Sequence, residues 1–212
     1  MTPVCLYILF LLLLLWQPIH LVGCYLPPTV VPECTCKEGV KGLTIHCTRL
    51  NSTRFFSHLH VDTAQAVVKV EVNDSELNCL DFTHFERFYK LKDLRVTNSK
   101  LKDLMCPANR ERYFMVAYNL RNLRSLDLSY NSLKHLDYKL KSSFLLDHLN
   151  LAHNELSQLS PVISRFKRLK YLNVSNNQLY NNLDQGVLES LPESLDNLDF
   201  SGRVLSRPVY VW

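Results

Sequence analysis

Seven cysteines and eight histidines are the side chains of this chain best suited to cross-linking or metal binding. Cys34, Cys36 and Cys47 lie within one short stretch, and His46 immediately precedes the last of them. Thiolate and imidazole groups clustered in this way can hold zinc in a reducing compartment. In an oxidising compartment the same cysteines form disulfides. The compartment in which the chain resides therefore decides between zinc binding and disulfide formation.

The first residues of the chain predict that it is secreted. Residues 5–16 form an apolar run that is too short to cross a bilayer comfortably, and Gln17 and Pro18 follow it. This pattern is typical of a signal peptide, which we assign to residues 1–23 with cleavage near Gly23 or Cys24. Residues 21–24 also match a bacterial lipoprotein box, but no basic residue precedes the apolar run. We therefore expect a secreted, extracellular protein.

Cleavage before Cys24 removes Cys5 and leaves an even number of cysteines, which favours disulfides in a secreted chain. Zinc held by Cys34, Cys36, His46 and Cys47 remains the alternative for the cysteine-rich stretch.

Motifs for catalysis or cofactor binding are missing from the sequence. The five glycines form no phosphate-binding loop, and neither a nucleophile elbow nor a helix with paired zinc ligands is present. We therefore predict no enzyme activity, no cofactor and no catalytic metal. The net charge of +4 is too small to indicate nucleic acid as a partner. No further apolar segment is long enough for a membrane span.

A repeat with a period near 23 residues positions most of the chain. Its pattern is Leu-x-x-Leu-x-Leu-x-x-Asn-x-Leu, the leucine-rich repeat. Six units fill residues 67–205: three close matches start at Leu123, Leu146 and Leu169, and looser ones start at Val67, Leu91 and Leu195. One unit alone cannot bury its apolar face, so the units must stack. We predict an α/β solenoid with a curved parallel sheet on its concave face and irregular or short helical return segments on its convex face.

Each position of the repeat has an expected role. Positions four and six point into the apolar interior, and the Asn at position nine must hydrogen-bond to backbone groups of its own turn and of the neighbouring one. Positions two, three, five, seven and eight are expected to face outward. An insertion near residues 107–122 predicts a short amphipathic helix, either covering the back of the solenoid or docking a partner. Cys79 and Cys106 fall on return segments one coil apart, which predicts a disulfide between them.

The cysteines ahead of the first repeat resemble the N-terminal cap of extracellular leucine-rich repeat proteins of the Slit-like, Toll-like and small proteoglycan type. The resemblance assigns residues 24–66 to such a cap and implies the disulfides Cys24–Cys36 and Cys34–Cys47. It also implies a secreted module for protein–protein recognition in adhesion, signalling or immune-type recognition. No cysteine follows Cys106 to form a second cap. The tail, residues 206–212, then covers the last coil, or the open edge pairs with another copy in a dimer.

The concave face is the predicted ligand site, because exposed aromatic rings among mixed charges are typical of protein-binding patches. A generic solvated sheet face is the competing interpretation. The candidate residues come from units three to five: Tyr130, His148, His153, Asp127 and Tyr171.

A basic convex face is the alternative binding site and would suit anionic glycans of an extracellular matrix. It consists of Lys139, Lys141, Arg165, Lys167 and Arg168, and an ordinary solvated surface is the favoured interpretation of these residues. Three sequons predict glycosylation at Asn51, Asn73 and Asn173. Asn73 stands at position seven and Asn173 at position five, so both are expected on the concave face.

Overall fold

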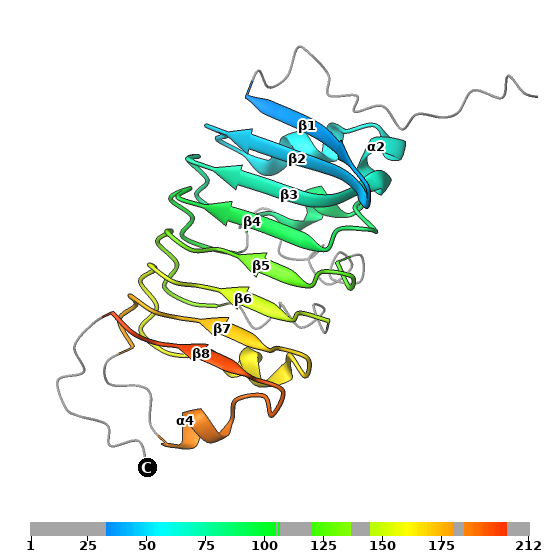
Figure 1. Cartoon of the computed structure of the whole chain (residues 1–212). Coiled ribbons are helices and arrows are strands. Elements are labelled where there is room, and N and C mark those ends of the chain that lie inside the picture. The colour runs from blue at the N-terminus through cyan, green and yellow to red at the C-terminus, as the bar shows by residue number, and fades with distance from the viewer. Residues whose placement is uncertain (1–32, 105, 107–119, 137–144, 180–184, 203–212) are drawn as a thin grey trace, which may run out of the picture.

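The computed structural model describes residues 33–104, 106, 120–136, 145–179 and 185–202. In this part of the chain eight strands form a single sheet in the order β1 to β8 (Figure 1). The strands are β1 (Cys34–Gly39), β2 (Gly42–Thr48), β3 (Val67–Asn73), β4 (Asp93–Thr97), β5 (Ser125–Asp127), β6 (His148–Asn150), β7 (Tyr171–Asn173) and β8 (Asn197–Asp199). β1 pairs antiparallel with β2, and all later neighbours are parallel. The predicted solenoid is thereby confirmed.

Strands β3 to β8 coincide with the six repeat units, and the described parts of the segments between β2 and β8 pass behind the sheet (Figure 1). In these described parts the return segments contain short helices only. They are η1 (Thr53–His58), α2 (Val61–Ala66), η2 (Phe82–Phe85), η5 (Pro161–Arg165) and α4 (Gln185–Glu189). Each of the 3₁₀ helices η1, η2 and η5 begins after a Ser or Asp whose side-chain oxygen accepts a backbone N–H of the first turn.

The hydrophobic core lies between the sheet and the return segments. Leu126, Leu149 and Leu172 at position four are almost fully buried and stand in register on adjacent strands. On the opposite side of the core the first return segments contribute phenylalanines, and the rings of Phe56 and Phe85 stack with centroids 4.8 Å apart. Stacked coils therefore share one continuous apolar interior, as the repeat requires.

The position-nine residues join each coil to its neighbour. The Nδ2 of Asn154 donates to the carbonyls of Leu128 in the preceding coil and Leu151 in its own, at 2.9 and 3.0 Å. Its Oδ1 accepts the N–H of Leu133, and Asn131 and Asn177 bond in the same manner. The expected role of this Asn is confirmed. Ser75 supplies part of it, since its hydroxyl accepts the N–H of Leu50.

Disulfides lie within the segment predicted to be the cap and between the first two repeats. Cys34 pairs with Cys47 across β1 and β2, and Cys79 pairs with Cys106 on neighbouring return segments. Because two of its four ligands are consumed by the first bond, the zinc alternative is wrong. Cys36 is also disulfide-bonded. Its implied partner Cys24 lies outside the described residues.

Several predicted segments fall outside the part of the chain that the structure describes. They are the signal peptide 1–23, most of the insertion (107–119), residues 137–144 with Lys139 and Lys141, and the tail 206–212. In the ranges described, no helix is both long enough and apolar enough to cross a membrane. β8 pairs only with β7 there, so the expected dimer through this edge stays a prediction.

Candidate functional site

Two rows of side chains cover the sheet face, one from position three and one from position five of each unit. Strand register places row three in the order Lys69, Asp93, Ser125, His148, Tyr171 and Asn197. Row five runs Glu71, Arg95, Asp127, Asn150, Asn173 and Asp199. The first two units carry only charged residues in these rows, whereas the later units carry mostly amides, hydroxyls and rings. The sheet face therefore has a charged and a largely neutral half.

Glu71 neutralises much of the charged half. Its carboxylate lies 2.8 Å from Lys69 Nζ, 3.7 Å from Arg95 Nη1 and 3.7 Å from His46 Nδ1. Partial burial opposes its ionisation, but the hydrogen bond from Lys69 and the charges of Lys69, Arg95 and His46 outweigh burial and lower the pKa of Glu71. The charges of these residues are paired with one another, so they exert little net electrostatic attraction on an outside ligand.

In units three to five, position seven turns away from the sheet face, which corrects the expectation that it points outward there. Ser129, Ala152 and Ser175 are no more than 5% exposed. The cause is a local turn in which the Asp or Asn at position five accepts the backbone N–H two residues later. Asp127 Oδ1 accepts from the N–H of Ser129 at 3.0 Å, and Asn173 Oδ1 accepts from that of Ser175 at 2.9 Å.

Position eight follows this turn and has a left-handed backbone in every unit. The residues and their φ angles are Asp74 (47°), Asn98 (48°), Tyr130 (57°), His153 (54°), Asn176 (54°) and Gly202 (99°). Asp, Asn, His and Gly tolerate this region, but a bulky aromatic residue rarely occupies it. Tyr130 is thus the one residue of the series that the backbone disfavours.

Tyr130, His153 and Asn176 form what we name the edge strip, beyond the ends of β5, β6 and β7. The rings of Tyr130 and His153 stack with centroids 4.2 Å apart and planes 11° from parallel. Asn176 Nδ2 lies 3.2 Å from His153 Nε2. A Cβ at Gly202 would collide with the Asn176 side chain, so glycine at this position leaves room for this arrangement. Tyr130 remains 57% exposed.

The five residues predicted to bind a ligand thus divide between two places. Tyr130 and His153 lie in the edge strip rather than on the strands themselves. His148 and Tyr171 lie on the neutral half of the sheet face, with ring centroids 6.0 Å apart. Asp127 is half-buried, and one of its carboxylate oxygens is engaged in the turn. Sequence reasoning missed Asn176 and Gly202, although the run of Asn, His and Gly types at position eight signals a shared left-handed turn.

In the described part of the convex basic face, one of the basic side chains is paired with a carboxylate. Arg165 and Lys167 are exposed. The Nε of Arg168 instead lies 3.7 Å from the carboxylate of Asp147, which also pairs with Arg124 at 3.8 Å. Arg168 is therefore partly neutralised by Asp147, the residue just before β6, which weakens the proposed basic patch.

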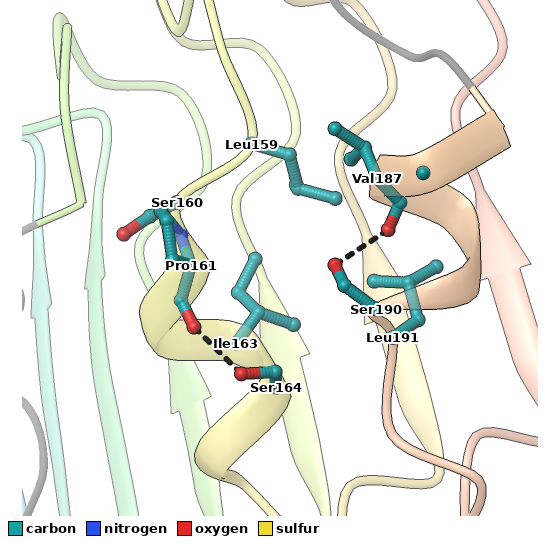
Figure 2. Close-up of a pocket in the computed structure, with 9 residues that line it drawn as sticks. Leu159, Ser160, Pro161, Ile163, Ser164, Val187, Ser190 and Leu191 are labelled. Carbon is teal, nitrogen blue, oxygen red and sulfur yellow. Dashed lines mark hydrogen bonds between the residues drawn. The ribbon is translucent and has the colours of Figure 1, made fainter.

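A pocket of about 320 Å³ lies behind the sheet between η5 and α4. Leu159 and Ile163 face Val187 and Leu191 across it (Figure 2). The hydroxyls of Ser164 and Ser190 both donate to backbone carbonyls of their own turns, at 2.8 and 2.7 Å. With no acid, base or free nucleophile among its lining residues, this pocket is unsuited to catalysis.

Comparisons with known proteins agree with this architecture. The family model described as Leucine Rich Repeat matches residues 122–143 and 168–198. The solved structure of a TLR13–ssRNA13 complex is similar with a TM-score of 0.61 and 23% identity, covering 79% of this chain and 22% of that one. The structure of an LRIM1/APL1C complex has a TM-score of 0.57 and 17% identity, covering 79% and 30%. At such identities the likeness shows the fold alone.

Two curated proteins are similar in sequence. An adenylate cyclase of Schizosaccharomyces pombe is 35% identical over 136 residues, and the volume-regulated anion channel subunit LRRC8D of Rattus norvegicus is 26% identical over 161 residues. The chain spans only 7% and 17% of the length of these relatives. The activities in their names therefore do not transfer to this chain. Repeat pattern, parallel sheet and comparisons together show the leucine-rich repeat solenoid fold.

Proposed function

We propose that the chain is a non-catalytic module that acts outside the cell and recognises a protein partner through the edge strip. The observation that carries this proposal is Tyr130. Its ring is exposed, is stacked on His153, and stands on a backbone conformation that disfavours it. Strain of this kind persists where the side chain serves a function.

The chemistry of the edge strip suits a protein surface. Exposed Tyr supplies a large, rigid contact area with a polar end, and tyrosine is enriched among residues that dominate binding energies. Its stacking on His153 orders the ring before binding, which reduces the entropy lost in the complex. The apolar leader and the disulfides support an extracellular location.

The test compares matched variants in partner capture. The secreted protein is used to capture a partner, which mass spectrometry identifies, and its affinity is then measured for each variant. We expect Tyr130→Ala and His153→Ala to weaken binding by about 1 to 2 kcal/mol each. Tyr89→Ala is the control, because Tyr89 is 47% exposed but lies elsewhere, between η2 and β4. Equal affinity of the variant that combines Tyr130→Ala with His153→Ala and of the Tyr89→Ala control would contradict the proposal.

Binding of anionic glycans by the convex face is the second candidate, supported by the exposed Arg165 and Lys167. Such binding is salt-sensitive, since it displaces counterions. It predicts retention on heparin that salt reverses and that substitution of Arg165 and Lys167 by Ser abolishes. If these substitutions remove partner binding while the Tyr130 and His153 variants keep it, the basic face is the site.

A further inference from the structure

We propose that Asn173 carries an N-linked glycan whose first sugar packs on Tyr171 and His148, so that the protein's own glycan covers the neutral half of its sheet face. This inference rests on the proposed secretion of the chain. It leaves the edge strip open to the partner of the proposed function.

The orientation of the Asn173 side chain is fixed by its turn. Its Oδ1 accepts the backbone N–H of Ser175 at 2.9 Å and the hydroxyl of Ser175 at 2.7 Å. Because a backbone N–H can only donate, the oxygen end of the amide must face the turn. The Nδ2 atom therefore faces the other way and lies 3.3 Å from the hydroxyl of Tyr171. Nδ2 is the atom to which an N-linked sugar is attached.

The surroundings of Nδ2 suit a neutral sugar. Tyr171 and His148 present two rings in row three, tilted by 31° to each other. Asn150 stands in register with Asn173 on β6, and its Oδ1 is engaged by the N–H of Ala152. Its Nδ2 is thereby directed outward as a donor. Flat rings pack against the C–H faces of a pyranose, while an amide N–H bonds its hydroxyls.

Attachment preserves the fold around Asn173. The Nδ2 atom attacks the anomeric carbon of a lipid-linked oligosaccharide pyrophosphate, a C–N bond forms and the C–O bond to the pyrophosphate breaks. The lipid pyrophosphate leaves with the bonding electrons, and Nδ2 loses one proton. Oδ1 is untouched, so the turn to Ser175 is kept. Since Ser175 is buried and its hydroxyl is bonded in the folded state, transfer must precede folding of this unit.

The other two sequons differ from this one in their surroundings. Asn51 is exposed on the turn before η1, so a sugar there projects into solvent. Asn73 Oδ1 accepts the hydroxyl of Thr97 on the next strand at 2.7 Å, in the charged half of the sheet. Asn51 therefore provides an internal reference for an unpacked glycan.

The experiment expresses the full chain in a eukaryotic secretory host and maps glycan occupancy by peptide mass spectrometry. The matched variant is Asn173→Asp, because Asp127 and Asp199 hold the same position and make the same turn bond at 3.0 Å. We expect occupancy at Asn173 and none in the variant, which should otherwise fold normally. In native wild-type protein, enzymatic removal of the Asn173 glycan should be roughly tenfold slower than removal of the Asn51 glycan, a factor that corresponds to about 1.4 kcal/mol of packing. Tyr171→Ala should abolish most of this difference.

The possible failures are distinct. An unmodified Asn173 beside an occupied Asn51 overturns the inference and leaves the proposed extracellular function intact. Absence of glycan at all three sequons overturns the inference and contradicts secretion as well. Equal removal rates at Asn173 and Asn51 show a glycan that does not pack on the sheet, which also overturns the inference.

Discussion

Replacing Tyr130 by Asn should remove backbone strain while deleting the proposed contact residue. A left-handed conformation costs a non-glycine residue about 1 to 2 kcal/mol, and Asn largely escapes this penalty. The substitution also removes the ring stacked on His153, a contact that contributes about 0.5 to 1.5 kcal/mol. The two effects oppose each other, so the single variant should change the free energy of unfolding by no more than about 1.5 kcal/mol.

A second genetic background separates the energy of the backbone strain from the energy of the ring stacking. His153→Asn removes the stack but keeps a residue that tolerates the φ of 54°. In that background Tyr130→Asn has no stacking to lose, so it should raise the free energy of unfolding by the full amount of about 1 to 2 kcal/mol. For a chain of this size each kcal/mol corresponds to roughly 2–4 °C in Tm. The difference between the two backgrounds measures the stacking energy of the pair.

Urea denaturation of the four proteins, with disulfides kept oxidised, measures these energies. The reasoning is refuted if Tyr130→Asn is neutral or destabilising in the His153→Asn background. In that case the backbone at position eight imposes no penalty on Tyr130, and the observation that carries the proposed function is lost.

Two further predictions concern stability in the first repeats. Burial lowers the pKa of His84 from its ordinary 6.5, and Arg54 and His58 add to this although the charge of Asp81 opposes it. The folded state favours the neutral imidazole. The contribution of His84 to the free energy of unfolding is therefore fully present above about pH 6.5 and is lost as the pH falls below that value. Between about pH 7 and pH 5 the urea midpoint should therefore fall more steeply in wild type than in His84→Gln. The control is His135→Gln, because His135 is exposed. Equal slopes of urea midpoint against pH in all three proteins would contradict this assignment. The second prediction is that replacing Cys79 and Cys106 by Ser, which opens a loop with a sequence separation of 27, lowers the free energy of unfolding by about 3.5 kcal/mol. An unchanged urea midpoint in this variant would show that the bond does not constrain the unfolded chain.

Repeat spacing predicted the architecture because each position of the unit has one dominant physical requirement. Leu149 at position four must be apolar, and Asn154 at position nine must satisfy backbone groups of two coils at once. Such requirements recur in every unit, so six copies of the pattern reinforce one another. The disulfide between Cys79 and Cys106 followed from the same register.

The candidate site was less predictable, because in units three to five simple strand alternation does not extend to position seven. β5 ends at Asp127, and the hydrogen bond from Ser129 to the Asp127 carboxylate turns the chain there. Alternation placed Ser129 outside, whereas the turn buries it. The same turn moves Tyr130 from the sheet face to its edge. Its effect depends on backbone dihedrals that apolar periodicity does not report.

The turn also determines what a ligand meets on the sheet. In units three to six one side-chain oxygen at position five is bound to the backbone, so Asp127 presents a second carboxylate oxygen and Asn150 presents an N–H. The fold therefore fixes both the residue types and their outward atoms along this row. Tyr130 is different, because the left-handed turn would accept Asn or Gly more readily. A side chain that the fold opposes needs a reason outside folding, and this makes Tyr130 a stronger functional signal than the equally polar residues of the sheet face.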